Sequence, residues 1–270
     1  MHFKFTKNLS LISALHYSKL IFRSGLFMTA AAIYLINRIR NTGSLFGGIE
    51  NRPIILGVIW LVFVVEMIFR FSPSRFESMG CQKQFAHNYI PTGAESPDLL
   101  PTRTVILIAL GWLGFNAIFG VLYFIGIIDR GILLLISLAF SVCDMICILF
   151  FCPFQTWFMK NKCCGSCRIY NWDYAMMFTP LIFIPSPYTW SILAAAAALL
   201  VHWEISVYRH GERFSEVTNA CLSCTHCKEK LCHHKKQLRS FLRRNRHRLH
   251  LLGNSAVAQH RLPGTPPSGN

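Results

Sequence analysis

The stretch VILIALGWLGFNAIFGVLYFIGIIDRGILLLISLAFSVCDMICILFF, residues 105–151, consists of two apolar runs separated only by Asp129 and Arg130. Each run is longer than the roughly 20 residues that an α-helix needs to cross the hydrocarbon core of a bilayer. Because the break is so short, the two runs predict a tight antiparallel pair of transmembrane helices. The chain is therefore expected to be an all-α, polytopic integral membrane protein.

The composition of the whole chain agrees with a bilayer as its solvent. Of the 270 residues, 53% are hydrophobic and 14% are charged, and the mean hydropathy is +0.38. A soluble domain averages nearer a quarter charged residues. The formal net charge of +15 indicates cytoplasmic loops and contact with anionic lipid headgroups. Nucleic acid is the less favoured partner, because the basic tail is short and shows no groove-reading motif.

Six apolar segments predict a bundle of about six transmembrane helices, at approximately residues 20–37, 53–71, 104–128, 131–151, 170–185 and 187–207. Arg23 interrupts the first segment and Pro180 the short fifth one. Ser186 and Pro187 are the expected N-cap and first helical residue of the sixth. Three domains follow from this pattern: residues 1–208 in the membrane, a basic Cys/His-rich amphipathic segment over residues 209–252, and a disordered tail over residues 253–270.

The basic residues predict the orientation of the bundle. The chain after Ile205 holds 12 of the 27 Lys and Arg residues, which places it in the cytoplasm by the positive-inside rule. With six crossings, 11 of the other basic residues are cytoplasmic and four are external; if the fifth and sixth segments form one broken crossing, this split inverts. We therefore predict six crossings, both termini in the cytoplasm, and a location in a bacterial inner membrane.

This topology gathers the cysteines on one side of the membrane. Nine of the 11 cysteines fall on the predicted cytoplasmic face, and the external loops contain none. Disulfides persist outside the cytosol, so the distribution argues against a disulfide framework. The other two, Cys143 and Cys147, lie four residues apart on one face of the fourth helix. The cysteines are thus candidates for metal ligation or thiol redox chemistry.

The strongest chemical signal is the tail motif NACLSCTHCKEKLCHHKK, residues 219–236. Thiolates two residues apart recur in zinc and iron–sulfur sites because they can turn back on one metal. The motif differs from the bacterial ferredoxin run by one residue in its last gap and by lacking the final proline. It predicts an iron–sulfur cluster or zinc, with iron–sulfur favoured; thiols that bind no metal in a disordered tail are the alternative. The predicted ligands are Cys221, Cys224, Cys227, Cys232 and His233.

A second group, formed by Cys163, Cys164 and Cys167, lies in the loop CPFQTWFMKNKCCGSC, residues 152–167. Its Cys-Pro at a helix end followed by clustered cysteines resembles the membrane polyferredoxins, although the paired C-x2-C-x2-C-x3-C-P runs of that family are absent. The resemblance implies an iron–sulfur site on the cytoplasmic side of the membrane. Two alternatives remain: the loop cysteines pack beneath the bilayer interface and bind nothing, or they share one site with the tail.

Two carboxylates lie within predicted spans, where ionisable groups are costly and often functional. Glu66 can pair with Arg70, one helical turn further on. Asp144 lies beside Cys143, and it can serve in a proton relay or pair with Asn116 or Arg23 across the bundle. We interpret Glu66 as a structural residue. For Asp144, a functional role and a structural role are both left as alternatives.

No nucleophile elbow, phosphate loop, zinc-protease motif or dinucleotide fingerprint is present, so the sequence gives no argument for group transfer. We predict an integral membrane metal-binding protein that acts as an iron–sulfur or thiol-based electron-transfer component on the cytoplasmic face. Its partner would be a quinone or a redox protein, which would make it part of a membrane oxidoreductase. The alternatives are a zinc-stabilised scaffold or assembly factor, and a small transporter that uses Asp144 and Glu66.

Overall fold

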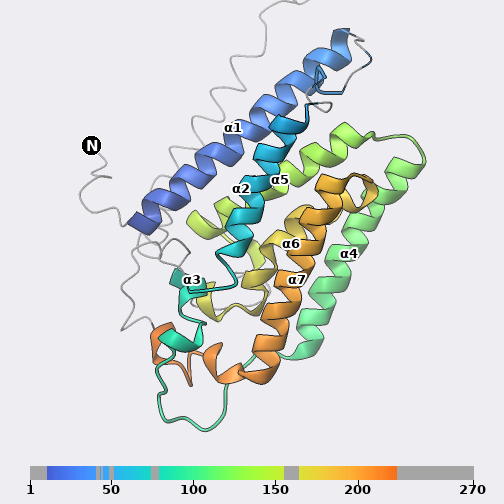
Figure 1. Ribbon diagram of the computed structural model, residues 1–270. Coiled ribbons are helices and arrows are strands. Elements are labelled where there is room, and N and C mark those ends of the chain that lie inside the picture. Colours follow the sequence, from blue (N-terminus) through green and yellow to red (C-terminus); the bar gives the residue numbers. More distant parts are fainter. Residues whose placement is uncertain are drawn as a thin grey trace, which may run out of the picture. The chain divides into compact units, whose positions relative to one another are not determined.

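The computed structural model describes residues 11–40, 43, 45–48, 52–73, 79–154 and 164–223. The chain divides into two compact units, Met1–Lys230 and Leu231–Asn270, and the described residues all belong to the first (Figure 1). In the described ranges the structure is helical, with one isolated β-bridge between Pro91 and Asn219 and no strand. The predicted all-α class is confirmed.

Four helices of the described part of the chain are long and apolar enough to cross a membrane. Large apolar side chains cover their outer faces: on the third predicted span, for example, Leu107 is 69% and Phe124 is 77% exposed. Lipid rather than water is the solvent that suits such surfaces. The four helices are α1 (Leu11–Arg40), α4 (Thr102–Phe124), α5 (Arg130–Leu149) and α7 (Pro187–Arg209).

The helix starts follow local rules. The Asp129 carboxylate caps α5 by accepting a hydrogen bond of 2.9 Å from the backbone N–H of Ile132. Ser186 is the N-cap residue of α7 and Pro187 its first residue, as predicted, although the Ser186 side chain makes no capping hydrogen bond. The helix α1 begins at Leu11, well before the predicted residue 20. The helix continues through Arg23, which interrupts the apolar segment, because Arg23 pairs with the carboxylates of Glu66 and Asp144.

The second and fifth predicted spans are less regular. The helix α2 (Pro53–Ile68) is apolar but has only 16 residues. The fifth segment is not a single α-helix: Pro180 lies in the first turn of its last part and cannot donate a backbone hydrogen bond. It consists of η5 (Arg168–Trp172), α6 (Asp173–Phe178) and η6 (Thr179–Phe183). The prediction of six complete helices is therefore not confirmed.

The fifth segment nevertheless accompanies α4 along most of its length. Ile169 packs with Val105 near the start of α4. Trp112 Nε1 donates a hydrogen bond of 3.3 Å to Thr179 Oγ1 halfway along. Phe183 meets Phe124 at the far end, with 6.0 Å between ring centroids. From Val105 to Phe124 an α-helix rises about 28 Å, close to the hydrocarbon thickness of a bilayer.

The core of the bundle is formed by pairs of neighbouring helices (Figure 1). The helix α1 packs against α5, α2 packs against α7, and the fifth segment lies against α5 and α7. Tyr17 of α1 meets Phe150 just after α5, and Tyr34 of α1 hydrogen-bonds Asp129 just before α5, so the two helices are antiparallel. Gly120 of α4 lies directly against the Phe183 ring, in the space that a Cβ atom would need.

Candidate functional site: a cysteine-bearing cap and an adjoining cavity

Three short segments that are far apart in sequence form a cap at one end of the bundle. We define the cap as residues 79–92, 164–172 and 211–222. It includes α3 (Met79–Gln82), η2 (Ala86–Asn88), η4 (Cys164–Ser166), η7 (Gly211–Arg213) and η8 (Ala220–Leu222). Trp203, near the end of α7, anchors the cap between the rings of Phe85 and Phe214, at centroid distances of 5.2 and 6.0 Å.

Side-chain amides hold the three segments of the cap together. Gln84 is buried, and its Nε2 donates a 2.6 Å hydrogen bond to the carbonyl of Gly165. Its Oε1 accepts a 2.8 Å hydrogen bond from Asn171. Asn219 is fully buried and donates to the carbonyls of Lys83 and Arg213, at 3.0 and 2.9 Å. Each amide thus satisfies backbone groups that would otherwise be buried without partners.

This arrangement brings cysteines from all three segments to the same end of the bundle. Cys81 is fully buried and Cys167 is 5% exposed. Cys221 is partly buried, and its Sγ donates a hydrogen bond of 2.9 Å to the carbonyl of Asn88. Cys164 belongs to η4, and its side chain lies outside the described atoms. The cap therefore contains cysteines of both predicted ligand groups.

The remaining predicted ligands lie outside the described residues: Cys163, Cys224, Cys227, Cys232 and His233. Within the ranges that the structure does describe, no group of three or more His, Cys, Asp or Glu side chains is arranged to hold a metal ion. The metal prediction thus remains a prediction. Its support comes from which segments meet in the cap.

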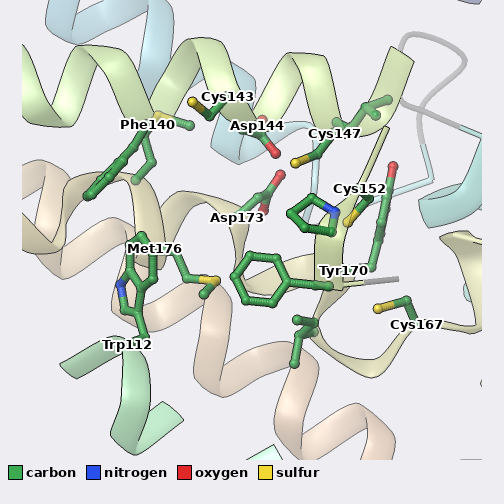
Figure 2. Close-up of a pocket in the computed structure, with 15 residues that line it drawn as sticks. Trp112, Phe140, Cys143, Asp144, Cys147, Cys152, Cys167, Tyr170, Asp173 and Met176 are labelled. Carbon is green, nitrogen blue, oxygen red and sulfur yellow. The ribbon is translucent and has the colours of Figure 1, made fainter. Parts of the chain in front are cut away.

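A cavity of about 280 Å³ adjoins the cap between α4, α5 and the fifth segment (Figure 2). Aromatic and sulfur-containing side chains make most of its wall, including Trp112 and Phe140, whose ring centroids are 4.9 Å apart. Four cysteines and two carboxylates also line it: Cys143, Cys147, Cys152, Cys167, Asp144 and Asp173. Figure 2 shows the two carboxylates directed toward each other.

Arg23 of α1 is the centre of a buried ionic network. It is 2% exposed, and its guanidinium donates to Glu66 of α2 at 2.6 Å and to Asp144 of α5 at 3.0 Å. It also donates to the Ser141 carbonyl at 3.2 Å. Glu66 accepts a further hydrogen bond of 3.1 Å from the Tyr174 hydroxyl. Of the two partners predicted for Asp144, Arg23 is the one observed.

The predicted pairing of Glu66 with Arg70 within one helix is wrong. Arg70 instead forms an ion pair of 2.6 Å with Asp173 at the start of α6, and its guanidinium lies over the rings of Tyr170 and Tyr174. Charges in the bundle are therefore paired between helices. Pairing of this kind offsets the cost of removing each charge from water, which explains how ionisable side chains are accommodated here.

Sequence reasoning missed the cavity and the position of Cys152 beside Cys147. The available signal was Pro153, which suits the first turn of a helix and not its interior, and so indicates a break in the helix before it. No known protein family, curated protein or solved structure matches this chain. The cap and the cavity are therefore the features from which a function can be inferred.

Proposed function

We propose that this chain is an integral membrane redox protein whose cysteines hold a metal centre, an iron–sulfur cluster, at the cap. One observation carries the proposal: segments bearing Cys81, Cys167 and Cys221 meet in the cap although they are far apart in sequence. The remaining tail cysteines follow directly. In the sequence, Cys224 follows Cys221 of the cap by three residues, which is at most about 10 Å of extended chain. Thiolates are the ligands that iron–sulfur clusters and zinc share.

The proposal includes six crossings, with the cap and both termini in the cytoplasm of a bacterium. The course of the fifth segment beside α4 supports this count, because a segment of about 28 Å that follows a spanning helix can itself cross. The start of α7 also lies beside the start of α2, where Tyr188 Oη donates to the Pro53 carbonyl at 3.3 Å. In this topology the net charge of +15 lies mainly next to anionic headgroups.

The partner of the metal centre would be a quinone or a second redox protein, and the chain would then be a component of a membrane oxidoreductase. The pairing of Glu66 and Asp144 with Arg23 accounts for both carboxylates as contacts between helices. It gives no separate support to a transport role. A zinc-stabilised scaffold would use the same thiolates, so metal identity separates it from the redox proposal.

The test is the metal and sulfide content of full-length protein purified without oxygen. The wild type should be brown, with iron and acid-labile sulfide. Cys224→Ser and Cys227→Ser should lose most of both while inserting normally, because insertion depends on the apolar spans. Cys143→Ser, a cysteine on α5 outside the cap, is the matched control and should keep its iron. A colourless preparation with stoichiometric zinc would favour the scaffold, and full occupancy in the tail variants would refute the ligand assignment.

A further inference from the structure

We propose that Cys147 and Cys152 form a redox-active dithiol that is oxidised by a quinone bound in the cavity shown in Figure 2. This inference deepens the proposed redox function and rests on it for the electrons that reduce the pair again. Three observations carry it: the contact between the two thiols, the character of the cavity wall, and the carboxylates that face the cavity.

The end of α5 brings the two thiols together. In an uninterrupted α-helix, residues five apart point about 140° away from each other. Here α5 ends at Leu149, and the N–H groups of Phe150 and Phe151 both bond the Ile146 carbonyl, at 2.8 and 3.1 Å. Helical structure begins again only at Pro153, so the chain turns between Leu149 and Pro153. This turn places Cys152 next to Cys147 in the cavity wall. Both side chains are only partly buried.

The cavity suits a small aromatic ligand from the bilayer. Its volume of about 280 Å³ is at the lower end for small-molecule sites and matches a single substituted ring. Trp112, Phe140 and Tyr170 offer faces on which such a ring can stack. Cys143, one turn before Cys147, is exposed on the surface of α5, so the cavity wall reaches the outside of the bundle. A quinone is the lipid-soluble oxidant that takes up two electrons and two protons, as a dithiol requires.

Asp173 supplies a polar group in the cavity wall. Asp173 Oδ2 is paired with Arg70, but Asp173 Oδ1 is buried and has no hydrogen-bond partner among the described residues. In Figure 2, Asp173 and Asp144 face each other beside Cys147. A buried oxygen without a donor is costly, and a hydroxyl of the reduced quinone would satisfy it. Asp173 is therefore assigned as a positioning residue for the ligand ring.

The reaction balances without a further reactant. One thiolate adds to a ring carbon of the quinone and forms an S–C bond. The second thiolate attacks the first sulfur, so the S–S bond forms, the S–C bond breaks and its electron pair stays on the ring. The two protons that the thiols release end on the two ring oxygens. Overall, one dithiol and one quinone give one disulfide and one quinol.

The test uses full-length protein in detergent, reduced without oxygen and freed of reductant, with decyl-ubiquinone as the probe. The wild type should reduce one quinone for each disulfide formed, and mass spectrometry should find a peptide linkage between Cys147 and Cys152. Cys147→Ser and Cys152→Ser should form no such linkage and lose quinone reduction. Ile146→Ala, next to Cys147 in sequence but with a side chain that is 40% exposed and does not line the cavity, should behave like the wild type. Trp112→Ala should raise the quinone concentration that gives a half-maximal single-turnover rate about tenfold, with little change in the rate at saturating quinone, because it removes one stacking face.

The outcomes separate this inference from the proposed metal centre. Cys147→Ser should keep the full iron content of the wild type while losing quinone reduction. If it loses iron instead, the thiol belongs to the metal centre and the dithiol assignment is wrong. A wild type that forms the Cys147–Cys152 disulfide with hydrogen peroxide but not with the quinone would also overturn the inference, whatever metal the cap holds.

Discussion

Replacing Arg23 by methionine is expected to destabilise the bundle more than any substitution of an exposed charge. Methionine can fill much of the volume of the arginine stem, so the change removes the charge and its hydrogen bonds with little loss of packing. The variant leaves two carboxylates without the cation that they share. These are Glu66 and Asp144, whose side chains are only 11% and 15% exposed.

The size of the effect follows from these contacts. Removing one partner of a buried ion pair costs about 3–5 kcal/mol. The lower end applies here, because Glu66 keeps Lys19 at 3.8 Å and the Tyr174 hydroxyl at 3.1 Å. Asp144 also faces the cavity. For a chain of this length, about 3 kcal/mol corresponds to a fall in Tm of about 6–12 °C.

The assay is thermal unfolding of the purified protein in one detergent. Arg130→Met is the matched control: Arg130 is exposed at the start of α5, and its replacement should change stability by no more than about 0.5 kcal/mol. Adding Glu66→Gln and Asp144→Asn to Arg23→Met should restore much of the loss, because neither buried carboxylate is then charged, and Lys19, whose side chain is 22% exposed, can still be solvated. A fall in Tm no larger than that of Arg130→Met would refute the ionic network, and so would a triple variant less stable than Arg23→Met alone.

Two further predictions concern packing and topology. Gly120→Ala should destabilise the protein by about 1–3 kcal/mol in the same assay, because its Cβ would collide with the Phe183 ring. The control Gly114→Ala, with nothing within 4 Å of the added carbon, should be neutral or stabilising. Equal effects of the two substitutions would contradict the close contact between α4 and η6. Reporter fusions at Lys7 and after Gly253 should both report a cytoplasmic location, and a periplasmic signal at Lys7 would exclude six crossings.

The spanning helices could be predicted from sequence because each depends on a local property, the length of an apolar run. The first span shows the limit of prediction from hydropathy. Lys19 and Arg23 reduce the apparent length of the first span, yet both lie within α1. Their cost is offset by Glu66 and Asp144, which are more than 40 residues away in sequence. Hydropathy contains no information about such distant partners.

The functional features divide in the same way. The cysteine spacing of the tail and of the loop is local and visible in the sequence. The contact between the segments that carry Cys167 and Cys221 depends on Gln84, Asn171 and Asn219, three amides whose partners no motif predicts. The Cys147–Cys152 contact was open to prediction, since a proline suits the first turn of a helix and Pro153 therefore indicates a break in the helix before it. The cavity was not, because its wall combines side chains from α4, α5 and the fifth segment.

The ionic network and the cavity are two sides of one arrangement. Asp144 and Asp173 both line the cavity, and each forms an ion pair with an arginine, Asp144 with Arg23 of α1 and Asp173 with Arg70, two residues after α2. The arginines fix the orientation of the carboxylates, so the polar wall of the cavity depends on helices that do not themselves line it. A change at Arg23 should therefore disturb the environment of Cys147 as well as the stability of the bundle. This coupling explains why a membrane protein would retain an arginine within its first span at the expense of hydropathy: the charge positions a carboxylate beside the thiol pair that we propose to be redox-active.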